Sequence, residues 1–342
     1  MNPEPAASWR TLDGVRAISI ALVLACHLLP LGPKTWIDLN IATGHMGMAM
    51  FFGLSGFLIA HKLQTEPGIK QFAVNRFLRI FPLLWLVLLI HFVWKWPNVD
   101  PKTLALNAAV WINHSRAHYL PETKHLWSVC VEVHFYVLAA IVFFIFKRRG
   151  VLMLVGLGLL LAVHRYLQAA IFNTTTIFRL DELLIPMLAG WVWHSTSPMA
   201  NRLKRFAAQC PPGLPLLALA VCSMAPPVLE LTILRPLWTT ALLLALLYNP
   251  GTRTALAFAH SGWRWLSRHA YALYLIHPFL LVTWLASGDK LTEYAKRPLL
   301  FAVLALLAYL STKYYERFFI ELGKRWFKPK AAEPSPPQFE RA

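Results

Sequence analysis

The first apolar stretch of the chain carries three residues that could do acid–base chemistry: Asp13, Arg16 and His27. On an α-helix, Arg16 and His27 lie within about 20° of the same face and roughly 16 Å apart along the axis, with Asp13 within about 40° of that stripe. Ionisable residues in a membrane span usually face a polar cavity rather than lipid. A neutral imidazole there can take a proton from a hydroxyl and return it to a leaving group. His27 is therefore a candidate general base, with hydrogen-bonded packing as the alternative.

Arginines could bind a phosphorylated ligand at the same end as Arg16. Arg76 and Arg79 are three residues apart at the start of a later apolar run. Two guanidinium groups on one helical face can hold a phosphate or pyrophosphate through paired hydrogen bonds. Contact with lipid headgroups explains the same pattern equally well, and Arg16 could also serve only to orient its helix.

Three further polar residues lie within apolar segments. Glu132 is about two turns into a span, where an unpaired carboxylate is costly, so it should be neutral, paired or facing water. Tyr136, four residues later, shares its face. The pair could orient an acceptor hydroxyl or a histidine, or could clamp two helices together. Ser55 could donate a hydrogen bond into a cavity, whereas its neighbours Gly53 and Gly56 favour close helix packing.

A second histidine, His277, precedes a proline in another apolar run, where packing is favoured over chemistry. Two groups of opposite charges are interpreted as local neutralisation: Arg179 with Asp181 and Glu182, and Glu316 with Arg317.

The composition predicts the elements that must position these residues. Of the 342 residues, 57% are hydrophobic and 14% are charged, against about 25% charged in a soluble domain. We therefore predict an all-α, polytopic transmembrane bundle. Apolar runs of suitable length predict ten helices, near residues 13–32, 44–61, 77–96, 126–146, 151–172, 177–194, 213–229, 231–249, 269–287 and 298–320.

The formal net charge of +17 is attributed to lysines and arginines in cytoplasmic segments, not to nucleic-acid binding. Their distribution predicts that both termini are cytoplasmic. Residues 1–328 are predicted to form one domain and the proline-rich residues 329–342 a disordered tail. The first span is expected to be retained rather than cleaved as a signal peptide. Residues 97–125 are expected to form a partial lid or an interfacial helix over the outer mouth. The four cysteines show no metal-binding or disulfide pattern.

Together, these motifs resemble the acyltransferase 3 family of integral membrane acyltransferases. The matching stretches are Leu12–Ala17 with His27, Phe52–Leu58, Arg76–Arg79, His125–Tyr136 and Tyr271–Pro278. The resemblance implies about ten transmembrane helices and transfer of an acyl group, commonly acetyl, from cytoplasmic acyl-CoA to a hydroxyl of a carbohydrate or other acceptor. It places His27 on the family's catalytic histidine, Arg16 on its arginine partner, and Arg76 and Arg79 on the arginines linked to donor binding.

Two features depart from the family pattern. Val133 and His134 follow Glu132 where the family usually continues with Glu and Gln, so the acceptor is expected to differ. The chain also ends soon after its last span, without the hydrolase-like domain that some members carry, and is expected to act alone or with a separate partner.

The predicted function is O-acyl transfer in the bacterial cytoplasmic (inner) membrane, with membrane lipid around the protein and no metal. Acyl-CoA binds near Arg76 and Arg79 and extends toward His27, and the acceptor is a surface polysaccharide, lipopolysaccharide or other glycan or glycolipid. Direct attack and an acyl-histidine intermediate both remain open. The predicted site consists of His27, Arg16 and Glu132 as catalytic residues, Arg76 and Arg79 for the donor, and Ser55, Tyr136, His277 and Asp13 for substrate. The alternatives are a transporter of a small anion or acylated metabolite, which would use the same buried charges as a path, and a sensing bundle that binds acyl-CoA without turnover.

Overall fold

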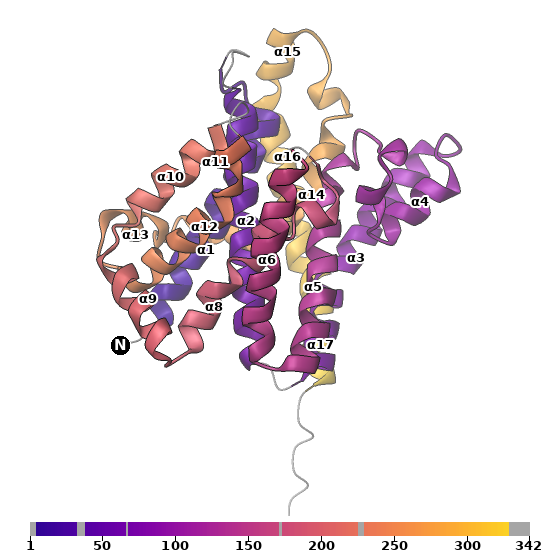
Figure 1. Cartoon of the computed structure of the whole chain (residues 1–342). Coiled ribbons are helices and arrows are strands. Elements are labelled where there is room, and N and C mark those ends of the chain that lie inside the picture. The colour runs from indigo at the N-terminus through magenta and orange to yellow at the C-terminus, as the bar shows by residue number, and fades with distance from the viewer. Residues whose placement is uncertain (1–4, 33–37, 66–67, 171–172, 225–228, 328–342) are drawn as a thin grey trace, which may run out of the picture.

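The chain folds into helices throughout its described part (Figure 1). The computed structural model describes residues 5–32, 38–65, 68–170, 173–224 and 229–327, and no strand occurs among them. The predicted all-α class is therefore confirmed. The predicted disordered tail, residues 329–342, lies outside the described residues.

Six helical stretches are long and apolar enough to cross a membrane: Trp9–Leu28, Leu39–Thr65, Ile69–Lys95, Lys124–Phe146, Arg149–Leu167 and Arg297–Trp326. They correspond to α1 (Pro5–Leu28), α2 (Leu39–Thr65), α3 (Ile69–Lys95), α5 (Trp127–Phe146), α6 (Arg149–Leu167), and the continuous run of α16 (Arg297–Leu310), a π-helical turn (Ser311–Glu316) and α17 (Arg317–Trp326). A seventh candidate is formed by α9 (Pro198–Gln209) and α10 (Gly213–Met224), which are bent by 90°.

The other helices are shorter or more polar. They are α4 (Pro101–Ala108), α7 (Asp181–Leu184), α8 (Met187–His194), α11 (Leu229–Ile233), α12 (Arg235–Tyr248), α13 (Arg253–Phe258), α14 (Trp263–Leu280) and α15 (Lys290–Ala295). A straight span needs about 20 apolar residues. The predicted span 177–194 is broken between α7 and α8, and 231–249 falls on α12, which has 14 residues. The described residues thus show six or seven candidate spans, and the number ten stays a prediction.

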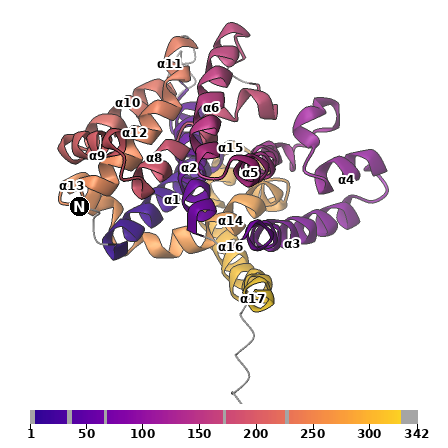
Figure 2. The same ribbon diagram turned by 60° about the horizontal axis from the view of Figure 1, so that its bottom comes forward.

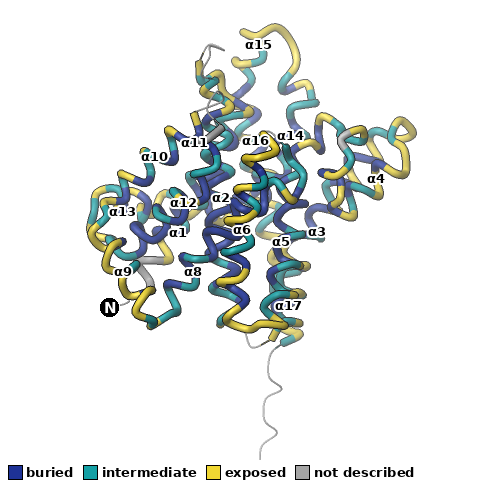
Figure 3. Tube along the Cα trace, in the orientation of Figure 1, coloured by how far each residue is buried: buried dark blue, intermediate teal, exposed yellow. Residues whose placement is uncertain are grey.

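Helix α2 is the centre of the bundle. It packs against α1, α8, α10 and α12 on one side and against α5 and α3 on the other, as Figure 2 shows. Figure 3 shows α2 largely buried, whereas the outer faces of α3, α6 and α17 are exposed. Exposed apolar residues include Leu89 and Val93 of α3, Phe144 of α5 and Leu160 of α6. Such a surface suits contact with lipid, and with six or seven candidate spans the protein is a multi-pass membrane protein.

Two glycines of α2 allow this central packing. A Cβ atom on Gly56 would lie 2.1 Å from the carbonyl oxygen of Leu183, and one on Gly53 would lie 2.1 Å from Cγ2 of Thr239. Neither distance leaves room for a methyl group. The packing role predicted for both glycines is confirmed.

The beginning of α1 and the end of α17 lie at the same end of the bundle (Figure 1), which we call the inner end; the opposite end is the outer end. At the outer end, α4 packs beside α3, where Trp85 Nε1 donates to the Ala108 carbonyl at 3.0 Å. Of the predicted lid segment 97–125, Pro121 and Lys124 line a cavity, whereas α4 extends to the side.

Candidate active site

Four histidines line a cavity of about 480 Å³ that we call the outer cavity: His27, His45, His125 and His277. His27 lies one residue before the end of α1, His277 lies in the last turn of α14, and His125 lies just before α5. Lys124 and Glu182 also line the cavity, together with residues from α2 and α12. Because α1 packs against α14, residues 250 positions apart meet in one place. The structure thus brings together His27 and His277, two of the predicted site residues.

The hydrogen bonds of the histidine pair select one arrangement of protons. His277 is fully buried, and its Nδ1 lies 2.8 Å from the carbonyl oxygen of Tyr274. A carbonyl only accepts, so Nδ1 of His277 donates, and in the neutral ring Nε2 must accept. Nε2 of His277 lies 3.1 Å from Nδ1 of His27. His27 therefore donates from Nδ1 and keeps Nε2 unprotonated, with its side chain accessible from the cavity. This is the form that a general base needs.

His125 is a further imidazole of the outer cavity and was not predicted as a site residue. Its ring centre lies 5.6 Å from that of His277. Neither of its ring nitrogens has a hydrogen-bond partner among the described residues, although the residue is buried. A buried ring without partners can offer a donor to a ligand. The sequence signal was its position at the start of the motif that also carries Glu132.

The other predicted site residues line a second cavity of about 340 Å³, nearer the start of α1, which we call the inner cavity. The seven predicted residues that it unites are Asp13, Arg16, Ser55, Arg76, Arg79, Glu132 and Tyr136. Lys62 lines it as well. The structure therefore separates Glu132 from His27 and groups it with the arginines.

Within the inner cavity, the carboxylate of Glu132 is held by its neighbours. It accepts a hydrogen bond from Ser55 Oγ at 2.8 Å and another from the Tyr136 hydroxyl. These contacts join α2 to α5, as the clamp interpretation predicted. Tyr136 also lies under the Arg76 guanidinium, whose carbon is 5.6 Å from the ring centre.

The cations of the inner cavity have few protein partners. Arg16 lies 3.4 Å from Asp13 Oδ1, and Ser267 Oγ donates to the same oxygen at 2.9 Å. The Nε of Arg76 is buried without a hydrogen-bond partner in the described part of the chain. Arg79 is exposed. A cavity with Arg16, Arg76, Arg79 and Lys62 suits a ligand with several negative charges.

An aromatic pair lies where the two cavities approach each other. Phe51 lines the inner cavity and Tyr274 lines the outer cavity. Their rings are stacked, with centres 6.3 Å apart and planes within 9°. The Tyr274 hydroxyl is fixed by Ser128 Oγ at 2.5 Å and by the His125 carbonyl at 2.7 Å. The pair therefore connects the linings of the two cavities.

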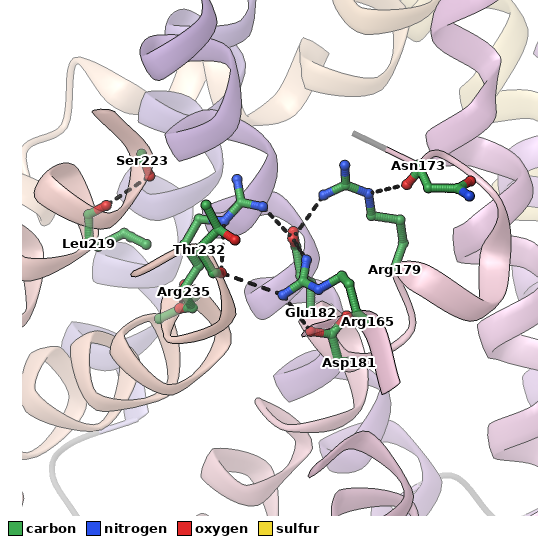
Figure 4. A network of polar contacts seen from close by, with 10 residues as sticks. Arg165, Asn173, Arg179, Asp181, Glu182, Leu219, Ser223, Thr232 and Arg235 are labelled. Carbon is green, nitrogen blue, oxygen red and sulfur yellow. Dashed lines mark hydrogen bonds and ion pairs between the residues drawn. The ribbon is translucent and has the colours of Figure 1, made fainter. Parts of the chain in front are cut away.

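A cluster of buried charges borders the outer cavity, and Figure 4 shows three guanidinium groups pointing toward Glu182. Arg179 pairs with Glu182 at 3.1 Å, which confirms that part of the predicted neutralisation. Arg165 and Arg235 also contact Glu182, and no local spacing predicted these two contacts. The second predicted pair is wrong. Arg317 binds Glu321 at 2.6 Å, while Glu316 accepts from Thr312 and Ser311. On a helix, i+4 neighbours face each other and adjacent residues do not.

Comparison with known proteins gives a family match over most of the chain. Residues 9–313 match the acyltransferase domain of the acyltransferase 3 family. The peptidoglycan O-acetyltransferase OatA of Listeria monocytogenes serovar 1/2a is 25% identical over 317 aligned positions, covering 80% of this chain and 49% of that protein. The O-acetyltransferase OatA of Staphylococcus aureus strain NCTC 8325 / PS 47 is 26% identical over 217 positions, covering 53% of this chain and 34% of that protein.

The chain spans about half the length, or less, of these relatives. No solved structure matches it. The family match nevertheless includes both cavities and every predicted site residue. The chain belongs to the acyltransferase 3 family.

Proposed function

We propose that the protein transfers an acyl group, with acetyl as the expected group, from cytoplasmic acyl-CoA to a hydroxyl of a carbohydrate-containing acceptor. The family and the names of the relatives support O-acyl transfer. The proposed location is the bacterial inner membrane, with ten spans and both termini cytoplasmic. The inner end then faces the cytoplasm and the outer cavity faces the other side.

The donor is proposed to bind with its phosphates in the inner cavity. Arg16, Arg76 and Arg79 line that cavity, and their guanidinium groups would bind the phosphate oxygens. A guanidinium binds phosphate through two parallel hydrogen bonds. From there the pantetheine arm would run along α1, past Phe51 and Tyr274, to bring the thioester to His27. The distance along α1 from Arg16 to His27 is roughly 16 Å.

In the proposed reaction, Nε2 of His27 removes the proton from the acceptor hydroxyl. The oxygen attacks the thioester carbonyl, the carbon–sulfur bond breaks, and His27 returns the proton to the CoA thiolate. His277 acts as a positioning residue because it holds the required tautomer of His27. His125 can donate a hydrogen bond to the carbonyl oxygen as negative charge develops on it.

The observation that carries this proposal is the hydrogen bond between His277 and His27 in the outer cavity, at 3.1 Å. The same helix, α1, extends from this pair to the cationic inner cavity. A transporter of anions could use the inner cavity, but it would not require one histidine to be held in its basic form.

The proposal is tested with purified protein in detergent, with radiolabelled acetyl-CoA and a glycan acceptor. His27→Ala should lower transfer at least about 100-fold, the typical contribution of a general base. His61→Ala is a matched control, because Nδ1 of His61 lies 2.9 Å from Nε2 of His194 in a second histidine pair, and neither ring lines either cavity. Normal turnover by folded His27→Ala protein would refute the assignment. Wild-type protein that moves anions across vesicles and transfers no acyl group would support the transporter alternative.

A further inference from the structure

A third hollow of about 470 Å³, which we call the lateral groove, lies between α3, α14 and the continuous run of α16 and the π-helical turn. Among its described lining residues none is a lysine, arginine, aspartate or glutamate, and most are aliphatic or aromatic. Its lining residues Ile90, Trp94 and Leu310 are exposed, so the groove is open to the surface of the bundle. Because α3 and the run that contains α16 are candidate membrane spans, this surface faces lipid hydrocarbon.

The lateral groove extends from the middle of α3 to the outer end of the bundle. On α3 its lining runs from Leu83 to Trp94, which is roughly 16 Å along the helix axis. This length is about half of the roughly 30 Å hydrocarbon core of a bilayer. A hydrocarbon chain that belongs to the outer leaflet therefore matches the groove in both length and chemistry.

The outer end of the lateral groove is bordered by polar side chains. Nζ of Lys95 lies 3.0 Å from Oε1 of Glu122, one residue beyond the last groove residue of α3. Oε2 of Glu122 lies 3.8 Å from Nε2 of His91, which lines the groove. Pro121, next to Glu122 in the chain, lines the outer cavity. An apolar groove that ends at polar groups suits a ligand with a hydrocarbon chain and a polar head, because polar groups are costly to place in hydrocarbon.

The lateral groove and the outer cavity share a wall at the end of α14. Phe279 lines the groove, whereas its neighbours His277 and Pro278 line the outer cavity. The ring centre of Phe279 lies 5.0 Å from that of His91 in the groove and 6.0 Å from that of His125 in the outer cavity. A molecule that fills the groove therefore has its polar end beside the cavity that contains the histidine pair.

We propose that the lateral groove binds the hydrocarbon chain of a lipid-linked acceptor, whose sugar enters the outer cavity and presents a hydroxyl to His27. A lipid of the bulk bilayer would fill any apolar groove on this surface, but this groove adjoins the proposed reaction site. The inference rests on the proposed function, which places the acceptor in the outer cavity. It adds the class of acceptor: a glycolipid of the outer leaflet rather than a free sugar or a glycan without a lipid anchor.

Photolabelling tests the groove without a donor. The probe is dodecyl N-acetylglucosaminide with a diazirine in its alkyl chain, added to the purified full chain in phosphatidylcholine nanodiscs. Labelled positions should concentrate in residues 83–94 and 276–283. Unlabelled dodecyl N-acetylglucosaminide should reduce this labelling, whereas the same concentration of dodecylphosphocholine should not. Labelling spread evenly over the exposed face of α6, or equal displacement by both compounds, shows a general lipid surface and overturns the inference.

Variants that fill the groove test whether it serves the acceptor. The measured quantity is the ratio of kcat/KM for dodecyl N-acetylglucosaminide to kcat/KM for methyl N-acetylglucosaminide. Val87→Trp should lower this ratio about 5-fold or more, which corresponds to the loss of about ten carbon–carbon contacts. Leu310→Trp, which fills the groove from the other wall, should do the same and serves if Val87→Trp does not fold. Leu160→Trp, at an exposed position of α6, is the matched control and should leave the ratio unchanged.

The comparison of variants cancels the enrichment of an alkyl glycoside in micelles, because this enrichment is the same for every variant. Equal loss of transfer to both glycosides in the two groove variants shows that the groove is only structural, and overturns the inference.

The outcome is distinguishable from failure of the proposed function. Head-group-selective labelling of the groove in protein that transfers no acyl group supports the groove and refutes the proposed reaction. Transfer to both glycosides with a ratio that the groove variants do not change refutes the groove and leaves the proposed reaction intact.

Discussion

Replacing His277 tests whether the histidine pair prepares the catalytic base. His277→Phe keeps an aromatic ring beside His27, where the two rings are now stacked with centres 5.1 Å apart. It removes the acceptor that lies 3.1 Å from Nδ1 of His27. A neutral hydrogen bond contributes about 0.5–1.5 kcal/mol, which corresponds to roughly 2- to 12-fold in rate. Loss of the tautomer preference adds a factor of about two, so kcat should fall roughly 10-fold.

The assay is steady-state transfer from radiolabelled acetyl-CoA, with kcat and the KM for acetyl-CoA determined separately. The KM should not change, because the donor phosphates are proposed to bind in the other cavity. His277→Gln is the matched rescue variant, since its amide oxygen can accept from Nδ1 of His27, and it should recover most of kcat. If His277 had only a structural role, kcat of the His277→Gln variant would not exceed that of the His277→Phe variant. Full kcat in His277→Phe, or equal loss in both variants, would refute the reasoning.

Three further predictions follow from other parts of the molecule. Arg76→Ala should raise the KM for acetyl-CoA by about 10-fold or more with little change in kcat. Arg317 is exposed, and Arg317→Ala should change neither constant. Equal changes of KM in the two variants, measured by steady-state kinetics, would contradict the proposed donor site. Gly56→Ala should lower the free energy of unfolding by about 1–3 kcal/mol or more, because a backbone carbonyl occupies the space. Gly156→Ala, with nothing within 4 Å of the added atom, should raise it by up to about 1 kcal/mol in denaturant titrations. Asp100 caps the N-terminus of α4. Hydrogen bonds from the side chain and backbone N–H of Thr103 lower the pKa of Asp100. The stability that ionised Asp100 contributes is therefore present at neutral pH and lost as the pH falls through its lowered pKa. Hydrogen exchange of α4, corrected for intrinsic rate, should show that the wild-type helix loses protection in acid. The Asp100→Asn variant, whose cap does not titrate, should not show this loss.

The features that were predicted correctly from the sequence are those that depend on a single helix. The shared face of Asp13, Arg16 and His27 follows from the helical repeat, and α1 is continuous through all three residues. The close approach at Gly53 and Gly56 also follows from local composition. The number of spans could not be confirmed in the same way, because α12 is too short by itself and α14 begins with charged and polar residues.

What the sequence could not predict is the division of the site into two cavities. His27 and Glu132 both looked like catalytic residues because each is an ionisable group in an apolar run. Only the packing of α1 against α14, and of α2 against α5, shows that they line different cavities. Arg165 and Arg235 were missed for the same reason. Local spacing indicated an i,i+3 pair at Arg179, whereas the contacts of the other two guanidinium groups with Glu182 form only when α6, α7 and α12 come together.

Two separate cavities, one lined by histidines and the other by the predicted donor arginines, suit a reaction whose two substrates come from different sides. The inner cavity has four cationic side chains and the carboxylates of Asp13 and Glu132, and Glu132 is already held by Ser55 and Tyr136. If the donor phosphates stay there, CoA need not cross the bundle, and only its pantetheine arm with the acyl group passes the aromatic pair of Phe51 and Tyr274. The acceptor then never meets the cytoplasm. In the proposed reaction the acyl carbon and an acceptor in the outer cavity meet at the histidine pair, which is why its hydrogen bond decides the proposed mechanism.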